Sequence, residues 1–256
     1  MDDTISITFG EQAVTHIGME TRGKEKINGF SLKEMTSILK EKKIKYEKIK
    51  LHNFLPEEGE KKGNKAYVLI IRNGLNIFLN DNKASDTLYK NLKQLPVDKK
   101  ILMRGRVVNK RARWNTCFDD NDQEPDIPNG KGTVIAFKKV DVLDKLRESL
   151  PKYFGSKASK LLAEMNYYYD LKNCGIGFHG DTERKIVICA RLGASMPMHF
   201  QWFTRHKPIG ERVKFKLNHG DIYIMSEKAV GTDWKKSSIV TLRHAAGAEK
   251  YTTIKN

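Results

Sequence analysis

The chain has 256 residues, of which 39% are hydrophobic and 30% are charged, and its formal net charge is +16. This length fits one large β-rich domain, or a compact domain with a smaller companion, and the hydrophobic fraction supports a proper core. No apolar run approaches the roughly 20 residues of a membrane helix, and the acidic first residues are unlike a secretory signal. Three scattered cysteines exclude a disulfide framework. We therefore expect a soluble intracellular protein, located in the cytoplasm or nucleus.

The positive charge predicts a polyanionic partner, since a pI near 9.6 attracts nucleic acid above all. The alternative is that the lysines, as in residues 40–43, only keep the chain soluble. We expect DNA or RNA as the partner, no membrane and a monomeric chain.

Residues 1–96 predict a small α+β unit. Residues 5–9 alternate as a strand does, and Ser31 with Glu34 forms the pattern of a helix N-terminus. Residues 66–71 form a buried-strand run.

A turn signal follows that strand at Asn73-Gly74, and it predicts a second strand over residues 75–79. Residues 81–96 are expected to form a helix and then a loop. The role of the whole unit stays open.

Residues 97–256 have a different character. The acidic stretch 119–126 predicts an exposed loop. Residues 141–164 predict helix, and Pro151 is expected to start a second helix after a break.

Short strands separated by glycine and proline turns follow the helical stretch. Their expected ranges are 165–171, 175–180, 185–193, 198–204, 212–217, 221–226 and 237–244. Such a series predicts an α+β protein whose centre is a double-stranded β-helix (jelly roll), with flanking helices and the small N-terminal α+β extension.

His179 and Asp181 are the first candidates for chemistry. Residues i and i+2 of a strand share a face, so both side chains are expected to point the same way. Two imidazoles and one carboxylate on one face form the facial triad of non-haem iron. His-x-Asp alone is a weak pattern, and without its context an ordinary polar turn after a strand is the better explanation.

The surrounding sequence resembles the signature of the AlkB-like dioxygenases. That signature has an Asn-x-Tyr strand, a glycine-containing turn and then His-x-Asp-x-Glu, here from Asn166 to Glu183. Residues 187–195 resemble the next strand with its Leu-Gly-Ala turn, and residues 217–225 resemble a later His-Gly-Asp segment. Residues 104–115 resemble the lid over the nucleotide. The resemblance covers residues 104–244.

This resemblance implies Fe(2+) and 2-oxoglutarate as cofactors. It places His179 and Asp181 on iron, and Asn166 and Tyr168 at 2-oxoglutarate. It further implies a substrate-binding set made of Arg111, Arg113, Asn115 and Glu183, with Trp114 and Trp202 as residues that could stack on a base.

The third metal ligand departs from the family's pattern. The family's spacing leads to Lys236, whose ammonium cannot ligate. We favour His244, although only twelve residues follow it and the last strand is then truncated. His219 is a weaker candidate, because Gly220 after it predicts a turn.

The cation that binds the co-substrate's carboxylate depends on the same choice. If residues 241–243 form the family's last strand, Arg243 pairs with that carboxylate. If His244 is the ligand, Lys250 or Lys255 takes this part.

The sequence therefore predicts an iron- and 2-oxoglutarate-dependent dioxygenase that hydroxylates or demethylates a base in DNA or RNA. Two alternatives stay open: the same chemistry on a protein or small molecule, and a catalytically inactive jelly roll that binds nucleic acid.

Overall fold

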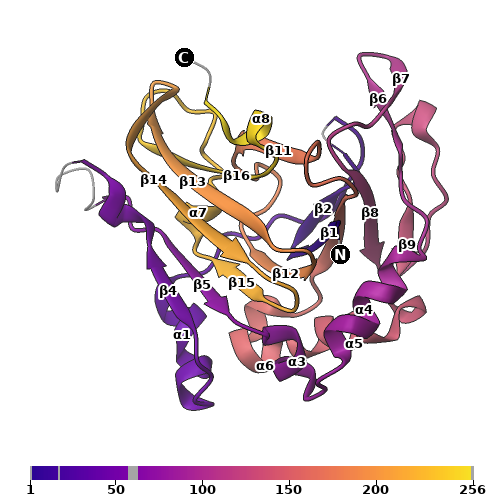
Figure 1. Cartoon of the computed structure of the whole chain (residues 1–256), viewed down its shortest axis with the longest axis horizontal. Helices are drawn as coiled ribbons and strands as arrows, with labels where there is room; N and C mark the ends of the chain where they lie inside the picture. Colours follow the sequence, from indigo (N-terminus) through magenta and orange to yellow (C-terminus); the bar gives the residue numbers. More distant parts are fainter. Residues whose placement is uncertain (1, 17, 57–62, 255–256) are drawn as a thin grey trace.

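The computed structural model of the chain describes residues 2–16, 18–56 and 63–254 (Figure 1). The fold is mixed α/β, with most of its regular structure in two large, mainly antiparallel sheets. None of the helices in the described ranges is long and apolar enough to cross a membrane.

The larger sheet has eight strands within the described residues, and neighbours are antiparallel except for the last pair. In spatial order they are β4 (Glu47–Lys50), β5 (Tyr67–Ile71), β15 (Ile222–Met225), β12 (Val187–Gly193), β1 (Thr4–Gly10), β10 (Leu162–Tyr168), β8 (Trp114–Asp119) and β9 (Val134–Ala136).

The smaller sheet faces part of the larger one. In spatial order its strands are β11 (Gly175–His179), β16 (Thr241–Gly247), β13 (Met196–Thr204) and β14 (Lys207–Leu217). Cys189 and Tyr223 of the larger sheet share an apolar cluster with Phe200 and Leu242 of the smaller one. Two hairpins lie outside both sheets: β2 (Gln12–Val14) with β3 (Thr21–Gly23), and β6 (Lys100–Met103) with β7 (Arg106–Asn109).

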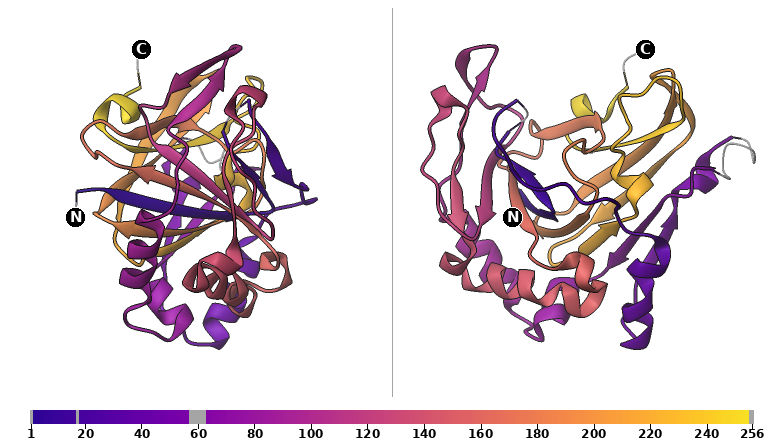
Figure 2. Two further views of the ribbon diagram at one scale, coloured as in Figure 1. Left: turned by 90° about the vertical axis from the view of Figure 1, so that its right-hand side faces the viewer. Right: turned by 180° about the vertical axis from the view of Figure 1, so that it is seen from behind.

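Helices cover the opposite face of the larger sheet and gather along one side of the molecule (Figures 1 and 2). They are α1 (Leu32–Glu41), α3 (Gly74–Leu79), α4 (Ala84–Lys93), α5 (Asp141–Ser149) and α6 (Pro151–Phe154). Their apolar side chains form the main core with the outward face of β1, β10 and β12. Two short helices, α7 (Glu227–Val230) and α8 (Glu249–Thr252), flank β16.

Strand β1 lies in the interior of the larger sheet. It pairs along its length with β10 on one side and with β12 on the other. Strands β4 and β5 extend the same sheet beyond β15. Residues 1–96 thus supply three strands to a sheet whose other strands follow residue 97, and residue 96 is no boundary of that sheet.

Several local predictions are confirmed. β1 covers the alternating residues 5–9, β5 covers the run 66–71, and α4 lies inside 81–96. Helix α1 begins after Ser31, whose hydroxyl accepts a hydrogen bond from the Glu34 N–H while the Glu34 carboxylate accepts from the Ser31 N–H. This capping box satisfies two backbone donors that the first turn leaves unpaired.

The strand predicted over residues 75–79 is wrong, because this segment is helix α3. Asn73 takes the left-handed conformation with φ of 52°, but its N–H donates to the Asp221 carboxylate and a hairpin does not follow. Leu75 and Phe78 are three residues apart, which places both on one helix face in the core.

The helix predicted over 141–164 is too long. Pro151 does start a second helix, α6, but Gly155 with φ of 75° ends it. Leu162, which looked like part of the helical pattern, is the first residue of β10. Each of the seven strands predicted after residue 164 overlaps an observed strand, with ends displaced by up to five residues.

Candidate metal centre

His179, Asp181 and His244 come together on the smaller sheet. His179 ends β11 and lies directly opposite His244 of β16 in the strand register, while Asp181 follows two residues later. One ligand atom from each residue lies within 4.8 Å of the others, and each histidine Nε2 is 3.5 Å from Asp181 Oδ1. This group could hold a metal ion.

Gly180 is required by the backbone packing around the two ligands of the His-x-Asp turn. A Cβ atom at this position would lie 1.9 Å from the Gly231 carbonyl oxygen, which leaves no room for any other residue. The Asp181 N–H donates to the Val230 carbonyl in the same turn. The loop after α7 therefore fixes the path of the chain between His179 and Asp181.

The His179 ring is oriented for ligation. His179 Nδ1 lies 2.8 Å from the Gly177 carbonyl oxygen, which can only accept a hydrogen bond, so Nδ1 carries the proton. In the neutral ring the lone pair is then on Nε2, which faces Asp181 and His244. Such a backbone contact to the far nitrogen is usual for histidines that bind metals.

Burial and charge set the protonation of the group. Burial alone would raise the pKa of Asp181, but its contacts with His179 and His244 and the charge of Arg184 hold the pKa well below its ordinary value. Burial, together with the neighbouring His179, lowers the pKa of His244. The described state is thus a carboxylate beside a neutral His244 imidazole, the forms that ligate metal.

Arg184 is an ion-pair partner of the Asp181 carboxylate. Its guanidinium is 3% exposed, donates to Glu164 at 2.7 Å and to Glu183 at 2.6 Å, and lies 3.9 Å from Asp181 Oδ2. Burial raises the pKa of Glu183 even though Arg184 is adjacent. Glu183, expected at the substrate, is therefore anchored at the rim of the centre by this ion pair.

The predicted Asn166 lies in a hydrogen-bonded row along β8 and β10. Its Oδ1 accepts from Arg113 Nε at 2.5 Å and from Asn115 Nδ2 at 2.6 Å, while its Nδ2 donates to Glu164 at 3.1 Å. Through Glu164 the row reaches Arg184. Arg113, Asn115 and Asn166, which were predicted to bind different ligands, are thus connected in one wall of hydrogen-bonded side chains.

A cavity of about 350 Å³ opens over the triad between the two sheets. The size suits a small molecule. The predicted residues that line it are His179, Asp181, His244, Asn166, Tyr168, Arg113, Asn115 and Glu183. Strand alternation explains the gathering, because β10 turns Glu164, Asn166 and Tyr168 to the same face.

Arg191 also lines this cavity and is absent from the sequence-based set. It lies on β12 within the otherwise apolar run Val187-Ile-Cys-Ala-Arg-Leu, and it is 2% exposed. A charged residue in a fully buried strand is rarely without a partner or a function. The charged residue within this apolar run was the signal by which the sequence could have identified Arg191. Ser6, Thr8 and Tyr223 line the same cavity, but no sequence pattern marks them.

Other predicted residues lie away from the cavity. Arg243, one position from His244, points to the other side of β16 between Phe203 and Trp234. Lys250 lies over the Tyr251 ring on α8. Neither of these two cations lines the cavity, nor does Arg111, whose carbonyl accepts from Tyr169.

The aromatic residues and the alternative metal ligands predicted from the sequence also lie in different parts of the structure. Trp202 is buried in the core, where its Nε1 donates to Leu51, so it is not available to stack on a base. Trp114 stacks on Tyr169 beside the cavity, at 4.0 Å between ring centroids. His219 accepts a hydrogen bond from the Gly193 N–H, and its Nε2 lies 3.4 Å from an Asp86 carboxylate oxygen, apart from the triad. Lys236 is exposed. Lys255 lies outside the described residues.

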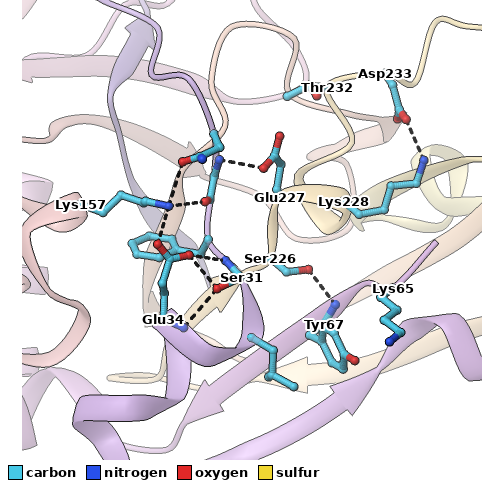
Figure 3. A pocket seen from close by; sticks show the side chains of 14 residues that line it. Ser31, Glu34, Lys65, Tyr67, Lys157, Ser226, Glu227, Lys228, Thr232 and Asp233 are labelled. Atoms are coloured by element: carbon cyan, nitrogen blue, oxygen red, sulfur yellow. Dashed lines mark hydrogen bonds and ion pairs between the residues drawn. The ribbon is translucent and has the colours of Figure 1, made fainter. Parts of the chain in front are cut away.

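A second hollow, of about 600 Å³, lies between the start of α1 and the loop after α7 (Figure 3). Four of its charged side chains form ion pairs: Lys157 with Glu34, and Lys228 with Asp233, both at 2.7 Å. Glu227 accepts from the Gly29 N–H. The residues that could hold a metal ion line the smaller cavity and not this larger hollow.

No family model matches the chain. The chain is 45% identical over 252 residues to the uncharacterized protein R156 of Acanthamoeba polyphaga mimivirus, a match that covers 97% of both chains. The chain belongs to the family of this viral protein. The match spans nearly the whole chain, so it takes in the N-terminal segment that supplies β1 as well as the segments in which the triad lies.

Proposed function

We propose that this chain is an iron- and 2-oxoglutarate-dependent dioxygenase that oxidises a base in nucleic acid. The observation that carries the proposal is the triad of His179, Asp181 and His244 at a cavity of ligand size. Two neutral imidazoles and one carboxylate on one side of an ion are the donor set of non-haem iron oxygenases, and this set leaves other coordination positions open.

The proposed fold is a jelly roll closed by its first strand. β10, β12 and β15 of the larger sheet alternate along the chain with β11, β13 and β16 of the smaller one. In this jelly roll a closing strand lies between β10 and β12. β1 occupies this position, so the sheet is closed by a strand from the N-terminal part of the chain.

The chain's own residues prepare the centre for this chemistry. His179, Asp181 and His244 would hold the ion, and Arg184 keeps the Asp181 carboxylate charged and oriented. With iron and the co-substrate bound there, the centre would gain the capacity to activate oxygen. The cavity lies between the two sheets, and Tyr168 and Arg113 give it a polar wall.

A base in nucleic acid is proposed as the substrate because of the surface beside the cavity. Residues 99–113, which form the β6–β7 hairpin and its flanks, contain seven basic and no acidic residues. The hairpin projects from the body of the molecule on the side away from α1 (Figure 1). The stacked pair Trp114 and Tyr169 lies at its base, and such aromatic faces bind unpaired bases.

The test is succinate formation by the full chain with ferrous iron, 2-oxoglutarate and oxygen. We expect turnover that rises when a methylated single-stranded oligonucleotide is added and rises less with the unmethylated one. His244→Ala should abolish both turnover and tight Mn²⁺ binding, whereas His206→Ala, on an exposed turn, should change neither. Unimpaired metal binding by His244→Ala, or no succinate from the wild type, would refute the proposal.

A further inference from the structure

Arg191 carries a buried positive charge for which the described residues provide no ion-pair partner. Its side chain is 2% exposed, and among the described residues nothing accepts a hydrogen bond from its Nε or Nη1. Burying an ion without a counter-ion is strongly unfavourable. Arg184, the other buried arginine at this cavity, contrasts with it because Glu164 and Glu183 neutralise that charge.

The position of Arg191 directs this charge into the triad's cavity. Strand alternation places it on the same face of β12 as Val187, which also lines the cavity. Ser6 of β1 is its direct neighbour in the strand register. Two buried hydroxyl groups, those of Tyr168 and Tyr223, lie close enough for the Arg191 charge to act on their pKa values.

These groups form an anion site of defined chemistry. A guanidinium presents parallel N–H donors that match the two oxygens of a carboxylate, and the neighbouring hydroxyls add further donors. One positive charge balances one carboxylate. The same cavity holds the metal triad, so one small ligand can occupy both ends.

We propose that Arg191 binds the distal carboxylate of an oxo-dicarboxylate co-substrate whose other end lies at the His179–Asp181–His244 centre. This inference rests on the proposed function. It assigns the carboxylate to β12 rather than to Arg243 or Lys250, because neither of those side chains lines the cavity. It also predicts selection against 2-oxo acids that lack the second carboxylate.

The experiment compares two ligands on the Mn²⁺-loaded full chain by calorimetry: 2-oxoglutarate and 2-oxobutyrate, which lacks the distal carboxylate. We expect the wild type to prefer 2-oxoglutarate by about ten- to one-hundredfold, the range for a charge-assisted pair. Arg191→Met should bind both ligands with similar weak affinity and keep its Mn²⁺ affinity. Lys250→Met, the matched control, should behave as wild type.

Three results separate the possible failures. Retained preference in Arg191→Met overturns the proposal. If Arg191→Met does not fold, Arg191→Gln, which also removes the charge, replaces it, and an unchanged preference there counts equally against the inference. If the wild type binds no metal, the proposed function fails, and the site is tested by thermal protection of the metal-free chain with succinate. Protection lost in the Arg191 variant upholds the anion site, and equal or absent protection overturns it.

Discussion

At the scale of single residues, the metal centre depends on a glycine that binds nothing. The Gly180 Cα faces the Gly231 backbone, and a methyl group there would overlap the Gly231 carbonyl. We expect Gly180→Ala to displace the turn, to cost about 1–3 kcal/mol of unfolding free energy and to weaken Mn²⁺ binding. Denaturant titration and calorimetry measure the two effects.

Gly177 provides the control on the same strand. A Cβ atom there has its nearest neighbour 3.7 Å away, an ordinary contact, so Gly177→Ala should alter neither stability nor Mn²⁺ affinity. Equal behaviour of the two variants would show that the turn tolerates a side chain and that the contact with Gly231 does not position the ligands.

The residues differ in how well the sequence could reveal them. His179 and Asp181 are two positions apart, so strand periodicity alone sets them on one face. His244 required knowing which strand lies beside β11, because the family's spacing led to Lys236 and only the need for an imidazole favoured His244. Arg191 and Ser6 meet only because β1 and β12 are neighbours. No local pattern encodes a pairing between residues that are 185 positions apart.

At the scale of elements, β1 is held in the sheet by a carboxylate near its start. Asp3 accepts hydrogen bonds from Tyr89 of α4, from Tyr167 of β10 at 2.6 Å and from Lys93 at 2.7 Å. Burial would raise the pKa of Asp3, but these partners outweigh it and hold the pKa below the ordinary 3.8. The ionised group therefore stabilises the fold.

We expect Asp3→Asn to lower the unfolding free energy at neutral pH by about 1–3 kcal/mol, the range for hydrogen bonds to a charged group. A depressed pKa stabilises the folded state above the unfolded value and loses that effect as the pH falls through the folded value. The difference between wild type and variant should thus shrink below pH 3.8. Thermal unfolding across pH measures it, with the exposed Asp2→Asn as control. A constant difference at every pH would contradict the assigned role of the charge.

The β6–β7 hairpin makes a separate prediction about nucleic acid. Arg106 and Arg111 are exposed, and Met103 and Val107 add exposed apolar surface between them. If Arg106 and Arg111 contact phosphates, the double variant to Gln should reduce the slope of log affinity against log salt by about 1–2. Fluorescence anisotropy with a labelled oligonucleotide gives the slope.

The control for the hairpin is an equal loss of charge elsewhere. Lys40 and Lys42 are exposed at the end of α1, on the far side of the molecule from the hairpin (Figure 1). Their double variant to Gln should leave the slope almost unchanged. The same reduction in both variants would mean that net charge, and not the hairpin, binds the polyanion.

At the scale of the whole molecule, the sequence predicted most elements but not their order in space. The strands after residue 164 were found from alternation and turn residues, which are local signals. The small N-terminal unit was inferred because its residues match no part of the dioxygenase pattern. What periodicity could not show is that β1 pairs between β10 and β12, since strand pairing is decided by packing across the sheet.

The last prediction follows from that pairing and concerns residues 97–256 expressed alone. Without residues 1–96 the chain loses β1, β4 and β5, so β10 and β12 have unpaired edges inside an incomplete sheet. We expect no cooperative thermal transition and no tight Mn²⁺ binding from this fragment, although it contains all three ligands. Co-expression with residues 1–96 should restore both, because Gln94–Val97 is a connection and not part of a strand. A fragment that unfolds cooperatively and binds Mn²⁺ like the full chain would show instead that β1 is dispensable, and the sheet would then have to close in another way.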